Sequence, residues 1–172
     1  MNGAEKLLET LDEELIVDAV IAQSKQQRND LWGIRDDVEG LFESLFPPMA
    51  FDISLSILDM EDYVEEVRAA LKNKWESARM VVFGHLGDGN IHLGLSVGSL
   101  EPEVVHAVED TVYEALGRRG GVISAEHGIG LDKRAYLAQS RSAEEIALMK
   151  TIKMAIDPKN ILNPGKILEI AN

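Results

Sequence analysis

The spacing of apolar and polar residues predicts a chain of alternating helices and short strands. Helices are expected over residues 4–14, about 24–45, 60–71, 102–117 and 142–157, and strands over 18–22, 51–57, 79–85, 91–97 and 122–125. Two serines are expected to cap helices, because each precedes a glutamine or glutamate by three residues: Ser24 with Gln27, and Ser142 with Glu145. The strongest signal is the Gly-Asp-Gly-Asn turn after residue 86, which predicts a hairpin.

Between residues 50 and 126 the elements follow the order β-α-β-β-α-β, which is typical of a ferredoxin-like fold. The predicted fold class is therefore α+β, an antiparallel sheet with helices packed on one face, in a single domain over residues 1–172. In the ideal form of this fold, the last strand ends at the opposite end of the sheet from the central hairpin. That topology separates Glu126 from His85 and His92 unless the sheet is arranged differently.

Composition excludes several classes of function. With 172 residues, 45% hydrophobic and 27% charged, the chain suits one globular domain. Its net charge of −13 argues against nucleic-acid binding, which needs an excess of lysine and arginine. No apolar run approaches the roughly 20 residues that a transmembrane helix needs. The lack of cysteine excludes disulfides and thiolate metal sites, fits a cytoplasmic location and leaves nitrogen and oxygen atoms as metal ligands.

Three of the four histidines lie in two glycine-rich turns. His85 and His92 flank the hairpin turn, and the glycines beside them leave room for a bound group. His92 shares a strand face with the small residues Gly94 and Ser96, and that face points away from the apolar side. A surface position or a hydrogen bond would explain either histidine alone, but the pair favours ligation of a divalent metal.

The second turn carries an acidic residue followed directly by a histidine. Glu126 can supply a hard oxygen ligand, and His127 can act as a general base. A loop in which the glycines adopt positive φ and Glu126 is solvated explains the same residues. The spacing alone favours neither the ligand and base pair nor the solvated loop.

Arg35 is predicted to face the core of the molecule. It falls on the apolar stripe of the helix expected over about 24–45, which consists of Leu31, Ile34, Val38 and Phe42. A guanidinium on a core-facing stripe needs a carboxylate, because an unpaired buried charge is costly. Two partners remain open: Glu39, one turn later in the helix, or the carboxylate of a substrate.

Four runs of sequence together resemble the C-terminal domain of the FAD-linked oxidases that oxidise D-2-hydroxy acids. These runs are Leu31–Arg35, Gly84–His92, Ser124–Arg134 and Asp157–Lys166. The group includes D-lactate, glycolate and D-2-hydroxyglutarate dehydrogenases. The resemblance covers nearly the whole chain, and the two histidine motifs together are highly specific.

The resemblance implies a role for each candidate residue. His127 would be the general base, Arg35 the clamp for the substrate carboxylate, and Asn163 and Asn90 would bind the cofactor FAD. The metal ligands would be His85, His92 and Glu126, holding zinc, with manganese or iron as alternatives. In the family the FAD-binding half precedes this domain, so the chain is expected to be part of a longer enzyme and inactive alone.

The implied reaction is oxidation of a D-2-hydroxy acid to a 2-oxo acid, by metal-assisted proton abstraction and hydride transfer to FAD. Relatives that use D-2-hydroxyglutarate carry polar or basic residues at the positions of Glu39, Ala50 and Gly94, so a lactate-like monocarboxylate is expected here. The expected partners are the FAD-binding domain, this substrate and an unidentified electron acceptor that can place the enzyme at a membrane surface; a homodimer is also considered. A metal-dependent hydrolase and a non-catalytic binding or assembly module stay open as alternatives.

Overall fold

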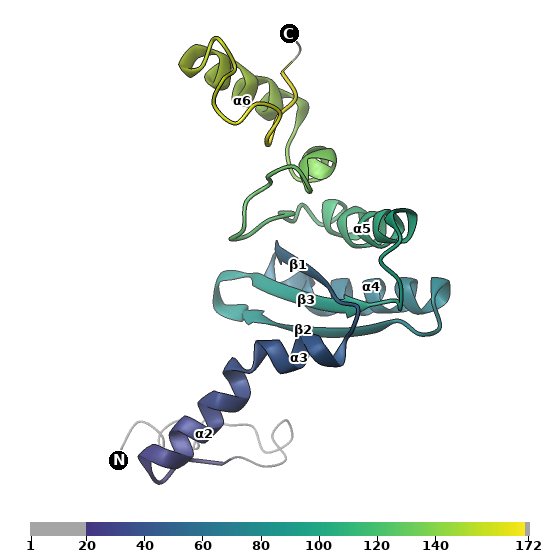
Figure 1. The fold of residues 1–172 in the computed structure, drawn as a ribbon, viewed down its shortest axis with the longest axis vertical. Coiled ribbons are helices and arrows are strands. Elements are labelled where there is room, and N and C mark those ends of the chain that lie inside the picture. The colour runs from purple at the N-terminus through teal and green to yellow at the C-terminus, as the bar shows by residue number, and fades with distance from the viewer. Residues whose placement is uncertain (1–19, 171–172) are drawn as a thin grey trace. The chain divides into compact units, whose positions relative to one another are not determined.

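The computed structural model describes residues 20–170, and the chain divides into two compact units, Met1–Leu41 and Phe42–Asn172 (Figure 1). Helix α2 (Lys25–Asp36) lies in the first unit, and α3 (Val38–Ser44) begins there. The second unit contains three strands, β1 (Met49–Ser54), β2 (Arg79–His85) and β3 (Asn90–Ser96), and three helices, α4 (Met60–Lys74), α5 (Pro102–Gly117) and α6 (Ala143–Ile156). It also has short 3-10 helices at Ile57–Asp59, Leu86–Asp88 and Arg134–Gln139.

The helix expected over about 24–45 is in fact two helices. Asp37 interrupts it with a ψ of 59°, outside the helical region, and its carboxylate accepts a hydrogen bond from the Gly40 N–H at 3.0 Å. Asp37 therefore ends α2 and caps α3. Its side chain binds a backbone N–H in place of the continuous helical hydrogen bonds, and the apolar stripe gives no sign of this break. Ser24 caps α2 as predicted, because its hydroxyl accepts a hydrogen bond from the Gln27 N–H at 3.1 Å.

Two expected elements fall near the start of the chain. The helix over 4–14 lies outside the described residues, and so do the first two residues of the strand over 18–22. The remaining three, Val20–Ala22, do not form a strand. A short apolar run becomes a strand only where another strand pairs with it, and no strand within residues 20–170 pairs with this one.

The second unit is an α+β structure, as the sequence predicts. Its strands form an antiparallel sheet in the order β1-β3-β2, and α4 and α5 pack against one face of it (Figure 1). Alternate strand residues enter the core between the sheet and these helices, among them Phe51, Ile53, Leu93 and Leu95. The intervening residues, which include Asp52 and His92, therefore lie on the opposite face of the sheet.

The strand expected over 122–125 is reduced to a single β-bridge. Val122 pairs with Ser54 at the end of β1 through two backbone hydrogen bonds, of 2.7 and 3.0 Å. The segment around Val122 therefore lies where a fourth strand would lie, antiparallel to β1 at the edge of the sheet. Glycines with positive φ at positions 128 and 130 follow soon after and turn the chain, which keeps the pairing short.

The shortness of this pairing decides where the second histidine motif lies. A full strand antiparallel to β1 would carry Glu126 to the end of the sheet away from the hairpin. Instead the last hydrogen bond between the backbone of this segment and the backbone of β1 runs from the Ala125 N–H to the Asp52 carbonyl, at 3.3 Å. Glu126 and His127 therefore lie beside the middle of β1, and the expected separation from the hairpin does not occur.

Helix α6 begins as predicted, with a reciprocal cap. The Ser142 hydroxyl accepts from the Glu145 N–H, and the Glu145 carboxylate accepts from the Ser142 N–H. Asp157 directly follows the helix and is buried. Its carboxylate accepts hydrogen bonds from the N–H groups of Ile161 and Leu162 in the next turn. Within residues 20–170, no helix has both the length and the apolar character needed to cross a membrane.

Candidate functional site

The first histidine motif forms a tight hairpin between β2 and β3. A 3-10 turn over Leu86–Asp88 leads into Gly89, whose φ of 80° is the left-handed conformation that glycine adopts readily. The Asn90 N–H donates to the Asp88 carboxylate at 3.1 Å and so closes the turn. This geometry brings the two histidine rings on either side of the turn together, with their centroids 5.9 Å apart and nearly perpendicular planes.

Gly84 is required by the close approach of the two hairpin strands. Its φ is 152°, and a Cβ there would lie 2.5 Å from the Asn90 carbonyl oxygen and 2.8 Å from the Ile91 Cα. We expect Gly84→Ala to lower the free energy of unfolding by about 1–3 kcal/mol, measured by urea denaturation. Gly87→Ala is the matched control, because a Cβ at Gly87 meets nothing within 4 Å; an equal loss in both variants would contradict this account.

Glu126 from the second motif completes a group of three potential metal ligands with His85 and His92. One ligand atom from each residue lies within 4.8 Å of the other two, and His85 Nδ1 is 3.4 Å from Glu126 Oε1. Two donors that each lie about 2.0–2.1 Å from a tetrahedral zinc ion are about 3.3 Å apart. Two imidazole nitrogens and a carboxylate oxygen therefore fit a divalent metal in both chemistry and spacing.

His127 lies at the edge of this group and is well exposed. Its ring stacks on the His92 ring, with centroids 6.2 Å apart and planes inclined by 20°. The side chain is 65% exposed, so one side of the ring is open to solvent or to a bound substrate. An accessible imidazole next to a metal-ligand group can accept a proton from a molecule bound there.

Asp52 belongs to the same site, although it is not among the residues that the sequence singles out. Its side chain is 1% exposed, and Oδ2 accepts hydrogen bonds from the N–H groups of Glu126 (2.7 Å) and His127 (2.9 Å). Oδ1 lies 3.7 Å from His92 Nδ1 and has no hydrogen-bond partner among the described residues. The signal that could have found it is its register, because Asp52 and His92 are cross-strand partners.

The electrostatics of Asp52 reflect two opposing effects. Burial raises the pKa of its carboxyl, but the two backbone N–H groups lower it, and so do electrostatic interactions with the His127 and Lys133 side chains. The lowering effects prevail, so the pKa of Asp52 lies below its ordinary value and the carboxylate is ionised at neutral pH. The pKa of Lys133 is lowered by burial, although the nearby charges of Asp52 and Asp132 oppose this effect.

The remaining candidate residues are Arg35, Asn90 and Asn163. Arg35, in the first unit, is exposed, forms an ion pair of 2.8 Å with Asp36 and stacks near the Trp32 ring, so its predicted place on a buried stripe is wrong. Helix α2 has no buried residues, which explains why the guanidinium needs no buried partner. Asn90 is buried at the turn, and its Oδ1 has no hydrogen-bond partner among residues 20–170, whereas Asn163 is exposed with a φ of 48°.

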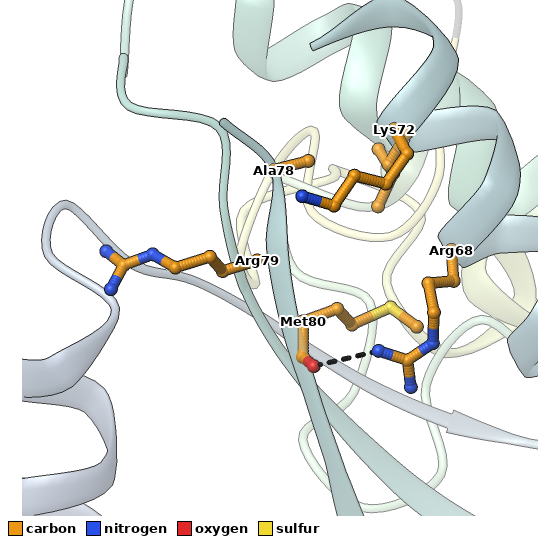
Figure 2. Close-up of a pocket in the computed structure, with 6 residues that line it drawn as sticks. Arg68, Lys72, Ala78, Arg79 and Met80 are labelled. Carbon is orange, nitrogen blue, oxygen red and sulfur yellow. Dashed lines mark hydrogen bonds between the residues drawn. The ribbon is translucent and has the colours of Figure 1, made fainter. Parts of the chain in front are cut away.

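A separate cavity of about 320 Å³ opens between α4 and β2 (Figure 2). It is lined by Arg68, Leu71, Lys72, Ala78, Arg79 and Met80. Arg68 donates to the Met80 carbonyl at 3.3 Å, while Arg79 extends away from the other two cations. None of the candidate residues lines this cavity, so the histidine cluster remains the candidate site.

Comparison with known proteins finds the same family that the sequence motifs resemble. The family model for the C-terminal domain of FAD linked oxidases matches residues 2–167. This chain belongs to that family. The resemblance proposed from the sequence is therefore confirmed, and the α+β structure is that of an FAD-linked oxidase C-terminal domain.

Curated relatives of this FAD-linked oxidase domain include several dehydrogenases. A D-2-hydroxyglutarate dehydrogenase of Xanthomonas citri pv. viticola is 40% identical over 92% of this chain and 34% of its own length. The mitochondrial D-2-hydroxyglutarate dehydrogenase of Arabidopsis thaliana is 37% identical, over 97% of the chain and 30% of the relative. A putative mitochondrial D-lactate dehydrogenase of Schizosaccharomyces pombe is 36% identical, over 91% and 31%. The chain thus spans about a third of the length of these relatives.

Proposed function

We propose that this domain holds a divalent metal and the substrate in an enzyme that oxidises D-2-hydroxy acids to 2-oxo acids with FAD. The observation that carries the proposal is the convergence of His85, His92 and Glu126 from two separate segments, with His127 beside them. Membership of the FAD-linked oxidase family supports the cofactor, and the names of the relatives support the class of substrate.

Each residue that the sequence singles out is given a task in this reaction. The proposed metal is zinc, with manganese or iron as alternatives. A divalent metal bound here would lower the pKa of a hydroxyl group that coordinates it. His127 is placed to take the proton of the substrate hydroxyl. FAD, when bound, accepts the hydride that leaves the α-carbon, so the alcohol loses two electrons and two hydrogens and becomes a ketone. Arg35 is proposed to bind the substrate carboxylate, and Asn90 and Asn163 the cofactor.

We propose a monocarboxylate such as D-lactate as the substrate. Ala50 and Gly94 face each other across β1 and β3, two residues along the strand from His92. A Cβ at Gly94 would meet Val81 at 3.0 Å and Leu45 at 3.1 Å, so apolar groups already occupy this position. These contacts offer nothing to attract a second carboxylate, which supports lactate over the dicarboxylate named for several relatives.

The proposed partners follow from the same reaction. FAD requires a binding domain beyond this substrate-binding half, and the reduced flavin requires an electron acceptor. The cytoplasmic location and the homodimer stay predictions. Several relatives are named as mitochondrial proteins, so the location is best decided by fractionating cells.

The proposed function is tested with the FAD-loaded enzyme that contains this chain. Loss of the oxidised flavin absorbance is followed after mixing with D-lactate, L-lactate or D-2-hydroxyglutarate. We expect D-lactate to reduce the flavin fastest, L-lactate not to react, and chelation of the metal to stop the reaction until metal is restored. Ester or amide hydrolysis without flavin would instead support a metal-dependent hydrolase, and no reaction of either kind would support a binding or assembly module.

A further inference from the structure

Asp52 is a buried carboxylate that contacts both histidine motifs, yet the proposed reaction assigns it no task. Its Oδ2 lies against the Glu126–His127 turn, and its Oδ1 faces the His92 ring from the neighbouring strand. Burying an ionised carboxylate costs free energy unless neighbouring groups stabilise the charge through hydrogen bonds or ion pairs. The position of this side chain therefore calls for an explanation beyond packing.

We propose that Asp52 is the positioning residue of the metal centre. Its Oδ2 fixes the turn that carries the third ligand, and its Oδ1 orients the His92 imidazole so that Nε2 faces the metal. This inference rests on the proposed function, because it assumes that His85, His92 and Glu126 hold a divalent ion.

Asp52 holds the backbone of the second histidine motif. Among residues 20–170, one β-bridge and the Ala125 N–H bond to the Asp52 carbonyl tie this segment to the backbone of the sheet, and that pairing ends before Glu126. Beyond this point the Asp52 carboxylate holds the segment in place, because its Oδ2 accepts hydrogen bonds from two successive backbone N–H groups at 2.7 and 2.9 Å. Ser124 adds a longer hydrogen bond of 3.5 Å to the same oxygen. Charge-assisted bonds to successive amides hold a turn firmly in one position.

Asp52 also faces the His92 ring, whose orientation is restricted. Phe83 and His127 flank this ring, with centroids 5.3 and 6.2 Å away, so its plane is confined. The Nδ1 atom is on the side of Asp52 Oδ1, at 3.7 Å, which is longer than a hydrogen bond. A small rotation of the ring when metal binds would close this distance. A carboxylate that accepts from one nitrogen of a ligating histidine fixes the tautomer and leaves the other nitrogen free to bind the ion.

A direct role of Asp52 as a metal ligand is less consistent with its surroundings. Asp52, Glu126 and His127 also lie close enough together to form a ligand group. However, Oδ2 of Asp52 already accepts two short hydrogen bonds, and Oδ1 is enclosed between β1 and the His92 ring. The half-exposed Glu126 and His85 offer their atoms on the open side of the site instead.

The test compares the zinc affinity of the full chain with that of the Asp52→Asn variant, by competition with a chromophoric chelator. We expect Asp52→Asn to weaken zinc binding by about 10- to 100-fold, as removal of a carboxylate partner of a ligating histidine does. Asp157→Asn is the matched control, because Asp157 is also buried, also accepts from two backbone N–H groups and lies outside the histidine cluster. We expect this control to bind zinc like the unchanged protein.

A second measurement does not depend on the folding of any variant. Long-range proton–nitrogen NMR spectra of the unchanged, metal-free chain report which nitrogen of His92 carries the proton, and we expect Nδ1. A proton on Nε2, or unchanged zinc affinity in Asp52→Asn, would overturn the role of Asp52 while the metal centre stands. If the unchanged chain binds none of zinc, manganese and iron, both the metal centre and this inference are wrong, so the two failures can be told apart.

Discussion

Replacing His127 by asparagine is expected to slow flavin reduction by about 100- to 10,000-fold in the FAD-loaded enzyme that contains this chain. Asparagine is polar and of similar size, but it cannot accept a proton at neutral pH. His127 is largely exposed and is not part of the hydrophobic core, so its replacement should leave the fold intact. Single-turnover absorbance of the flavin measures the rate, and zinc content should stay as in the unchanged protein.

The matched control for this variant is His106→Asn. His106 is an exposed histidine on α5 that pairs with Glu109 within the same helix, so its replacement should not change the rate. A normal rate for His127→Asn would show that another group takes the hydroxyl proton. Loss of zinc together with loss of rate would show instead that His127 supports the metal and is not the base.

Replacing His92 by alanine is expected to remove bound zinc. The change leaves His85 and Glu126 of the three ligands, and it removes the least exposed one, because the His92 side chain is 19% exposed and the other two are 48% exposed. We expect the loss in affinity to exceed the 10- to 100-fold that removal of an outer partner of a ligand causes. Plasma mass spectrometry on the chain, purified without chelator or a metal-binding tag, should find nearly one zinc per unchanged chain and only traces in the variant.

His106→Ala serves as the control here, because it also removes one of the four histidines. It should keep its zinc, since its only ion-pair partner on α5 is Glu109 and neither belongs to the cluster. Equal zinc in His92→Ala and the unchanged chain would mean that the ion binds elsewhere. In that case the convergence of the two motifs would need another explanation.

Sequence reasoning succeeded where the signal is local. The hairpin is encoded by its turn residues, and the two strands lie over 79–85 and 90–96, within a residue of the prediction. Helix α5 lies over Pro102–Gly117 as predicted, because proline at its start and a regular apolar stripe act within one element. The face of β3 that carries His92 also follows from simple alternation.

It failed where the outcome depends on contacts between distant segments. The strand expected over 122–125 is reduced to the β-bridge at Val122 and one further backbone hydrogen bond from Ala125 before the glycines turn the chain. The burial of Asp52 depends on the turn at Glu126 and His127, more than 70 residues later, whose N–H groups bind its carboxylate. The apolar stripe around Arg35 suggested burial, yet the helix that carries it is exposed throughout. Periodicity reports what an element can bury, not what covers it.

The weak attachment of the second motif gives a bound metal a mechanical consequence as well as a chemical one. The segment after Val122 is tied to the sheet by one β-bridge and a few bonds to Asp52, and an ion shared by Glu126 and the hairpin would join the two as a cross-link. In a chain without cysteine, such a link takes the place of a disulfide but can be reversed. By mass action it would add about 2.7 kcal/mol to the stability when free metal exceeds its dissociation constant by about 100-fold. The supply of metal would then set how firmly this domain holds its shape.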